Sequence, residues 1–266
     1  MIAINTIRRE PHYRRAAFDA GLERLGYKLV TSGPPRSRED LLLMWNLHGG
    51  NETLAAEWER LGGTVLVCEN GYLGRDELGR QLYAIAAHGH NGSGWFPVGT
   101  DGRFEALGID LAPWRPEGGH MLVAGQRGIG SRSMASPSGW DDRTVARLRD
   151  IKVQNVKLRR HPGRTTPETT LEQDLDGASL CVIWSSASGV KALTMGIPVV
   201  YCAPHWICEG AASRGLGTIS APVRDDALRR LAMHRMAYGQ WRVEEIEAGA
   251  PFRWILEHPH FGSLKW

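Results

Sequence analysis

The chain has 266 residues, of which 42% are hydrophobic and 23% are charged, and its formal net charge is +3. These values exclude a disordered or fibrous chain and are typical of a globular protein with one large or two modest domains. No apolar run approaches the roughly 20 residues that span a bilayer. The N-terminal MIAINTIRREPHY lacks the basic-then-apolar order of a secretory signal. We therefore expect a cytoplasmic protein without a membrane partner.

The four cysteines form no CxxC pair. Cys202 and Cys208 flank His205, but this spacing fits no zinc pattern. A catalytic metal is not expected. We expect no metal site.

The first half of the chain alternates apolar strand-like runs with helical stretches. Strands are predicted at 2–7, 27–31, 40–47 and 64–68. Helices are predicted at 8–26, where Gly26 is a C-terminal stop, and at 51–61, where Asn51 is the N-cap. Strand, helix and strand at this spacing predict a parallel sheet with right-handed crossovers. From Gly71 to Gly119 the pattern loosens, which indicates a functional loop or a linker.

A second α/β pattern follows. Strands are predicted at 120–124, 155–158, 180–184 and 198–202, and a strand or buried loop at 217–220. Helices are predicted at 142–149, 188–195 and 225–236, with one or two more in the tail. We predict an α/β fold with two Rossmann-like doubly wound domains facing a cleft. The N-terminal domain would span 1–115 and the C-terminal domain 116–266, and the last helix could pack back on the N-terminal domain.

Three strands of the second half lead into loops that could bind an anion, at 125–133, 159–163 and 185–189. The carboxyl ends of strands in a doubly wound sheet share one crevice, so these loops would converge on a diphosphate. The predicted ligand residues are Arg127, Gly128, Arg159, His161, Ser185, Ser186, Ser188 and Gly189. Taken singly, each has a structural alternative, such as a solvated strand end for Arg159 or a helix cap for Ser188.

His161-Pro162, Ser185-Ser186 and the pattern Gly–x–x–Ala–Leu–x–x–Gly–x–Pro over 189–198 resemble the donor half of GT-B glycosyltransferases. The resemblance is to the capsular-polysaccharide and bacterial sialyltransferase group and covers roughly residues 120–202. It implies that the HP motif and the Ser motif hold the phosphates of a nucleotide sugar. A UDP sugar is the first choice, with CMP and GDP sugars as alternatives, and no other cofactor is implied.

The glycine loop and the tail pattern Gln240-Trp241-x-x-Glu244-Glu245-Ile246 are similar to GT-B-like proteins of bacteriophages. This resemblance implies an acceptor in double-stranded phage DNA, a 5-hydroxymethylated pyrimidine such as 5-hydroxymethylcytosine, modified in the host cytoplasm. A surface or capsular glycan is the alternative acceptor. The enzyme would have to flip a base from the duplex into its cleft.

Inverting transfer to a hydroxyl needs a general base, normally from the other domain. Glu69 follows the predicted strand 64–68 and resembles the acidic-acidic-Gly motif of the sialyltransferase-like group, with Asn70 in the second acidic position. The alternative for Glu69 is a loop or N-cap carboxylate. His88, His90 and Asp101 are rival bases.

On the acceptor side, the predicted contacts are His48, His90, Asn91 and Arg8. Arginines cluster at the predicted strand ends of the first domain, where they would neutralise DNA phosphates; they are Arg8, Arg9, Arg14, Arg15, Arg36 and Arg38. A solvated basic surface is the alternative. Two other functional classes stay open, a nucleotide-sugar epimerase or hydrolase and a non-catalytic nucleic-acid-binding protein.

Overall fold

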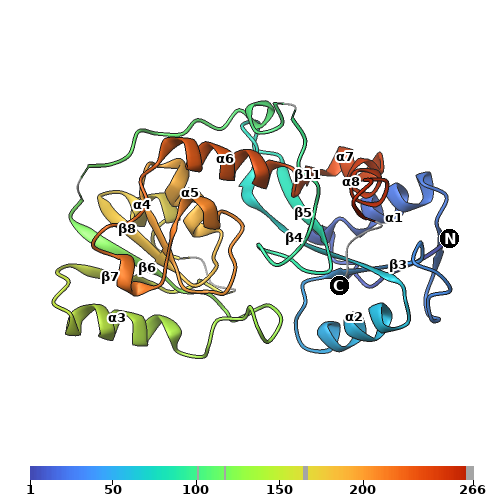
Figure 1. Cartoon of the computed structure of the whole chain (residues 1–266), viewed down its shortest axis with the longest axis horizontal. Helices are drawn as coiled ribbons and strands as arrows, with labels where there is room; N and C mark the ends of the chain where they lie inside the picture. The colour runs from blue at the N-terminus through green and yellow to red at the C-terminus, as the bar shows by residue number, and fades with distance from the viewer. Residues whose placement is uncertain (101, 117, 164–166, 262–266) are drawn as a thin grey trace. The chain divides into compact units, whose positions relative to one another are not determined.

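The computed structural model describes residues 1–100, 102–116, 118–163 and 167–261, and the chain divides into two compact α/β units (Figure 1). Unit 1 combines residues 1–107 with the segment from Arg235 onward, and unit 2 is Gly108–His234. Residues 108–115, assigned from sequence to the first domain, thus belong to unit 2. The tail belongs to unit 1 because its strand and its two helices pack there.

Unit 1 is built on a six-stranded sheet with the strand order β11-β5-β4-β3-β1-β2. Its strands are β1 (Ile2–Asn5), β2 (Lys28–Val30), β3 (Leu41–Trp45), β4 (Thr64–Arg75), β5 (Gln81–Ala87) and β11 (Gln240–Arg242). The four strands from β2 to β4 pair in parallel, as predicted, whereas β5 and β11 are antiparallel to their neighbours.

The hairpin of β4 and β5 corrects the sequence prediction of a loose segment after Gly71. β4 continues to Arg75, and Gly79 with φ +75° turns the chain into β5. The β5 run LYAIAA is almost fully buried. Alanine is a poor strand former in isolation, but here the run is paired on both sides, by β4 and by β11. Tertiary pairing therefore decides the conformation of this segment.

Helices cover both faces of the unit 1 sheet (Figure 1). They are α1 (Arg15–Arg24), α2 (Gly50–Arg60), α7 (Val243–Glu247) and α8 (Ala250–Leu256), with 3-10 turns at Pro11–Tyr13 and Glu105–Leu107. Trp58 of α2 packs with Met44 and Val67 on one face. On the other face α1 meets α7 so closely that a Cβ at Gly21 would lie 2.0 Å from the Ile246 carbonyl oxygen.

The predicted helix 8–26 is shorter than expected. A 3-10 turn occupies Pro11–Tyr13, and Arg14 adopts the left-handed conformation with φ 52° before α1 begins at Arg15. Proline cannot donate an intrahelical hydrogen bond, which explains why the regular helix starts after it.

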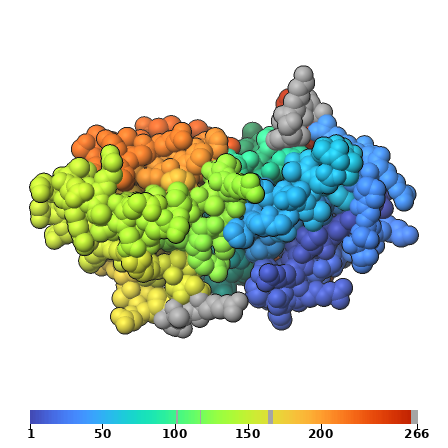
Figure 2. Space-filling model, turned by 90° about the horizontal axis from the view of Figure 1, so that it is seen from below, coloured from blue at the N-terminus to red at the C-terminus, as the bar shows by residue number. Residues whose placement is uncertain are grey.

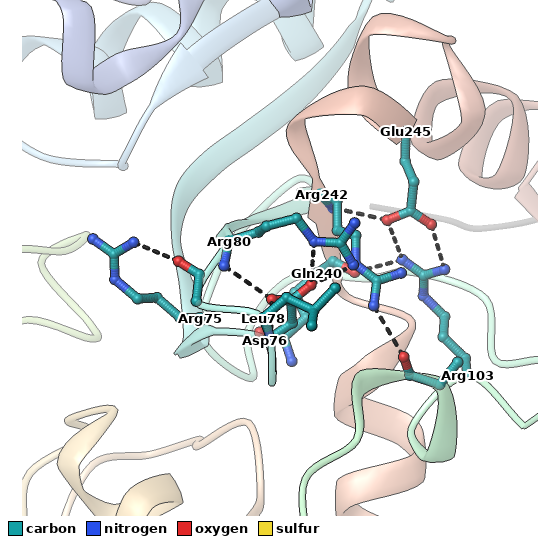
Figure 3. A network of polar contacts seen from close by, with 10 residues as sticks. Arg75, Asp76, Leu78, Arg80, Arg103, Gln240, Arg242 and Glu245 are labelled. Carbon is teal, nitrogen blue, oxygen red and sulfur yellow. Dashed lines mark hydrogen bonds and ion pairs between the residues drawn. The ribbon is translucent and has the colours of Figure 1, made fainter.

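The tail is fastened to the hairpin by a network of charged side chains (Figure 3). The Asp76 carboxylate is fully buried and accepts hydrogen bonds from Arg242 (2.8 Å) and Arg80 (2.7 Å). Burial would raise the pKa of Asp76, but these bonds lower it to about 2. Arg103 forms a bidentate pair with Glu245 at 2.8 and 3.1 Å. The tail is therefore an integral part of unit 1.

Unit 2 contains a five-stranded parallel sheet with the order β10-β9-β8-β6-β7. Its strands are β6 (His120–Ala124), β7 (Val156–Arg159), β8 (Ala178–Ile183), β9 (Val199–Tyr201) and β10 (Ser213–Arg214). Its helices are α3 (Trp140–Asp150), α4 (Leu171–Leu175), α5 (Ser188–Thr194) and most of α6 (Asp226–Ala237), with 3-10 turns at Glu209–Ala211 and Leu216–Thr218.

Helices flank this sheet too, with α3 on one face and α4 and α5 on the other (Figure 1). Figure 2 shows the face of each unit that carries α3 or α2. The core between α3 and the sheet contains Trp140, Leu148, Val123 and Val182. Numbered along the chain, the strands lie in the order 2-1-3-4-5 and the winding reverses between β6 and β8. Such a reversal point is where doubly wound folds bind ligands.

Candidate functional site

The loops that follow β6 and β8 meet at the reversal point of the unit 2 sheet. The Ser185 backbone N–H donates to Gln126 Oε1 (3.0 Å), and Gln126 Nε2 donates to Ser185 Oγ (3.2 Å). Two segments 59 residues apart in sequence are thus joined through one side chain. Sequence reasoning missed Gln126, whose only signal was its place directly after a strand in a glycine-rich loop.

The glycine loop folds back over the end of β8 and encloses a pocket. Trp184 Nε1 donates to the Met134 carbonyl oxygen (2.8 Å) and so anchors the loop. A Cβ at Gly125 would lie 2.8 Å from Asp141 Oδ2, so a larger residue there would displace the Asp141 side chain. The pocket has a volume of about 390 Å³ and is lined by Gln126, Arg127, Gly128, Ser136, Pro137, Ser138, Gly139, Trp140 and Asp141. Its size lies within the range of small-ligand sites.

His161, in the loop after β7, is poised to donate a hydrogen bond as a neutral ring. Its Nδ1 accepts the Gly163 backbone N–H (2.9 Å), so the neutral ring carries its proton on Nε2. Partial burial, with the nearby charges of Arg127 and Arg159, lowers the pKa of His161. Arg127 acts on this pKa from the β6 loop, and the Gly125 backbone N–H at the start of that loop donates to the Arg159 carbonyl oxygen (2.8 Å) at the end of β7. An anion would find here a guanidinium and a neutral N–H donor.

Arg159, predicted as a phosphate ligand, is engaged elsewhere. Its guanidinium forms an ion pair with Asp174 and donates to the carbonyl oxygens of Thr169 (3.1 Å) and Thr170 (3.3 Å). These bonds hold the start of α4 against the end of β7. We therefore assign Arg159 a structural role, with only its charge acting on His161.

The serine turn before α5 presents the Ser186 hydroxyl, while the backbone N–H groups of Ser185 and Ser188 are used within the protein. Ser186 Oγ accepts from the Ser188 backbone N–H (3.2 Å) and from Ser188 Oγ (2.6 Å), which leaves the Ser186 hydroxyl hydrogen to point elsewhere. Ser185 has already used its backbone N–H on Gln126. Gly189, predicted as a ligand, donates its backbone N–H to the Ser186 carbonyl oxygen (3.1 Å), and a Cβ there would lie 2.6 Å from Ile183 and 2.7 Å from the Trp206 ring.

In unit 1, Glu69 lies within β4 opposite Ala84, not after the strand as the sequence predicted. The ladder loses its regular register directly after Asn70. Glu69 Oε1 is buried and accepts no hydrogen bond within the described part of the chain. Burial raises the pKa of Glu69, and the opposing effects of His90, the Tyr72 hydroxyl and the Asn91 backbone N–H are smaller. A carboxyl group whose pKa is shifted towards neutrality is suited to proton transfer.

Two of the predicted acceptor contacts lie beside Glu69. His90 is only 6% exposed, and its Nδ1 is buried without a hydrogen bond in the described residues. A tight turn fixes this position, because Ser93 Oγ donates to the His90 carbonyl oxygen (2.7 Å). The Asn91 backbone N–H donates to the Tyr72 hydroxyl (3.1 Å). Tyr72 was not singled out from the sequence, and Glu69, Tyr72, His90 and Asn91 together form what we term the Glu69 cluster.

The remaining predicted contacts are not gathered in this cluster. His48 and Arg8 are exposed and follow β3 and β1. The rival base His88 contacts Glu59, with 2.5 Å between Nδ1 and Oε1. Asp101 lies outside the described residues.

Some of the arginines assigned to DNA phosphates serve unit 1 itself. Arg15 donates to the Ile7 carbonyl oxygen (2.7 Å) and pairs with Asp19. Arg38 donates to the Phe261 carbonyl oxygen and lies over its ring. Arg8 and Arg9 remain exposed at the end of β1. The basic surface available to a polyanion is therefore smaller than the sequence suggested.

Within the ranges that the structure describes, no group of three His, Cys, Asp or Glu side chains is placed to hold a metal ion. In the same ranges, no helix has the length and apolar character needed to cross a bilayer.

No family model matches the sequence, and no curated protein is significantly similar to it. Among the solved structures that are similar to the chain are two bacterial sugar transferases. The first is Thermosulfurimonas dismutans KpsC, β-Kdo 2,7 transferase, with 12% identity, a TM-score of 0.53 and coverage of 97% of this chain and 99% of that one. The second is the β-Kdo 2,4 transferase of KpsC from the same organism, with 15% identity, a TM-score of 0.57 and coverage of 90% and 92%. The chain is thus similar in fold to two bacterial Kdo transferases.

Proposed function

We propose that the protein is a glycosyltransferase that moves a sugar from a nucleotide-sugar donor to a hydroxyl group of a glycan. The observation that carries the proposal is the meeting of the loops after β6 and β8 at the reversal point of the unit 2 sheet, with the loop after the neighbouring strand β7 beside them. They present the Arg127 guanidinium, the neutral His161 Nε2–H and the Gln126–Ser185 junction. The fold likeness to two sugar transferases supports the same class of reaction.

In the proposed reaction unit 2 binds the donor phosphates. Arg127 pairs with a phosphate oxygen, and His161 and Ser186 donate hydrogen bonds. As the bond between the anomeric carbon and the phosphate oxygen breaks, its electron pair passes to that oxygen. The fixed charge and the fixed donors stabilise the negative charge that develops there. The adjoining pocket of about 390 Å³ is a place for the nucleoside.

Glu69 is the proposed general base for the acceptor. It takes the proton of the acceptor hydroxyl as that oxygen forms its bond to the anomeric carbon. Its raised pKa brings its basicity closer to what catalysis at neutral pH needs, and its buried, unbonded Oε1 leaves one oxygen unused by the fold. His90 and Asn91, beside it, are the proposed acceptor contacts.

A glycan fits the acceptor side better than DNA. Binding a duplex depends on neutralising many phosphates. Two of the six arginines assigned to that role, Arg15 and Arg38, donate hydrogen bonds to backbone carbonyl oxygens of unit 1. DNA that contains 5-hydroxymethylcytosine is therefore kept as a test acceptor.

The experiment incubates the full chain with UDP, GDP and CMP sugars, separately, and with neutral and acidic oligosaccharides or with hydroxymethylated and unmodified DNA. Mass spectrometry of the products reads out transfer. Transfer to an oligosaccharide supports the proposal, whereas transfer only to hydroxymethylated DNA overturns the choice of acceptor. Conversion of the donor without any acceptor indicates an epimerase or hydrolase. Absence of turnover and of nucleotide binding refutes the enzyme assignment.

A further inference from the structure

A second pocket lies in unit 1, and none of its lining residues belongs to the Glu69 cluster. Its volume is about 500 Å³, within the range of sites that bind small molecules. Tyr238, Trp241 and Trp254 form its aromatic wall, and Arg253, Glu257 and His258 contribute polar groups. The proposed reaction uses none of these side chains.

The aromatic wall is held rigidly by the fold. Trp254 Nε1 donates to the Pro97 carbonyl oxygen (2.9 Å), and the indole ring stacks on Tyr238 with the centroids 5.6 Å apart and the planes 21° apart. Gly99 packs against both rings, since a Cβ there would lie 2.9 Å from Tyr238 and 3.1 Å from Trp254. Trp254 is only partly buried. Its orientation is therefore set before any ligand arrives, which lowers the entropic cost of binding.

The Trp241 indole, the second tryptophan ring of the wall, is held in place by the Arg103 side chain. The Arg103 guanidinium lies 3.9 Å from the ring centroid, held by its bidentate pair with Glu245 (Figure 3). Trp241 is 5% exposed, and its Nε1–H has no acceptor among the described residues.

The charges of the pocket indicate an uncharged ligand. Arg103 is paired with Glu245, and Arg253 lies 3.8 Å from Glu257. Each guanidinium thus has a carboxylate beside it, so a phosphate or a carboxylate ligand would gain little. An aliphatic chain could cover the aromatic rings but would leave the polar groups unused. A sugar ring uses both, because its C–H face stacks on an aromatic ring while its hydroxyls reach charged and amphipathic side chains.

We propose that this pocket binds a neutral sugar residue of the glycan, at a distance from the hydroxyl that reacts. Trp241 pairs with Tyr83 and Tyr83 with Asn70, whereas Glu69 pairs with Ala84, so the side chains of Trp241 and Glu69 lie on opposite faces of the unit 1 sheet. β11 is the edge strand of this sheet, and an acceptor chain that occupies the pocket would pass around this edge to reach Glu69. Only the identification of the ligand as the acceptor rests on the proposed function; the sugar-binding chemistry of the pocket does not.

The test measures sugar binding by the full chain in the absence of any donor. The probes are maltohexaose and cellohexaose, with an oligogalacturonate as the acidic comparison. Their binding is measured by calorimetry and by saturation-transfer NMR. We expect a neutral probe to bind and Trp254→Ala to weaken it at least about tenfold, as removal of a stacking ring should. Trp254→Phe keeps a ring and should retain most of the binding. Leu78→Ala, at a position 69% exposed in the same unit, is the matched control.

Thermal unfolding of each variant shows whether it is folded. Equal affinity of the wild type and a folded Trp254→Ala variant overturns the proposal, and so does a wild type that binds neither neutral probe. A preference for the acidic probe also overturns it. If Trp254→Ala does not fold, Trp254→Phe decides, because a folded Phe variant without binding contradicts stacking. Donor turnover is measured separately. Oligosaccharide binding without turnover therefore refutes the glycosyltransferase proposal but not the assignment of the pocket as a sugar site.

Discussion

Replacing His161 by alanine tests the proposed donor site most directly. The ring accepts the Gly163 N–H on Nδ1, so Nε2 carries the only proton that a neutral His161 can donate. The substitution removes one hydrogen bond to a charged phosphate, which is worth about 1.5–3 kcal/mol. Because the His161 side chain is only partly shielded from solvent, we take the lower end, about 1.5 kcal/mol. This corresponds to roughly tenfold weaker nucleotide binding.

The assay is isothermal titration with UDP, CMP and GDP, using whichever binds the wild type. His161→Gln is the matched control, because its side-chain amide can place an N–H near the position of Nε2, and it should bind within about threefold of the wild type. Because the pKa of His161 is lowered, the neutral ring predominates at pH 7, and the effect should be similar at about pH 8. Unchanged affinity of a folded His161→Ala variant would refute the assignment. An affinity of the wild type that falls steeply between about pH 7 and 8 would show instead that a charged imidazolium binds the phosphate.

Three further predictions concern the base and the packing of each unit. Glu69→Gln should lower kcat by about 10²–10⁴-fold at unchanged nucleotide affinity. The base acts in its ionised form, and burial raises the pKa of Glu69. As the pH is lowered, wild-type turnover should therefore begin to fall at a higher pH than it would with an ordinary carboxylate as the base. Near-wild-type turnover of this variant would exclude Glu69 as the base. Arg242→Met leaves the buried Asp76 with one guanidinium fewer and should cost about 3 kcal/mol in denaturant unfolding. The ionised Asp76 stabilises the folded state at pH values above the pKa of this carboxyl in the unfolded chain, and the contribution is lost as the pH falls through about 2. In Arg242→Met this loss should begin at a higher pH. Identical acid unfolding curves of the wild type and the variant would contradict the prediction. Gly196→Ala should unfold unit 2 or lower its melting temperature strongly, since φ is +72° and a Cβ would lie 1.9 Å from the Pro113 carbonyl oxygen; Gly217→Ala, where a Cβ meets open space, is the control that should melt like the wild type.

The sequence by itself determined the local elements and the α/β class. Apolar runs such as 41–45 and 180–183 are long enough and uniform enough to predict buried strands, and the structure has β3 and β8 there. The HP and Ser motifs also located the loops after β7 and β8, because residues directly after a parallel strand must lie at the same edge of the sheet.

Only the tertiary structure decided which residues in those loops are free to act. Arg159 and Gly189 sit in motifs that predicted ligands, yet one is held by Asp174 and the other by the space between Ile183 and Trp206. Gln126 had only its place in the glycine loop as a signal and Tyr72 had none, because their roles depend on partners 59 and 19 residues away.

The same reason explains the tail, whose strand β11 becomes a strand only by pairing with β5. Its QWR run is too short to form a stable strand alone, and β5 supplies the hydrogen-bonding partner. A periodic pattern reports what a segment does with its own neighbours along the chain. Contacts between distant segments, which set the pKa of Glu69 and close both pockets, depend on the whole fold and leave no such pattern.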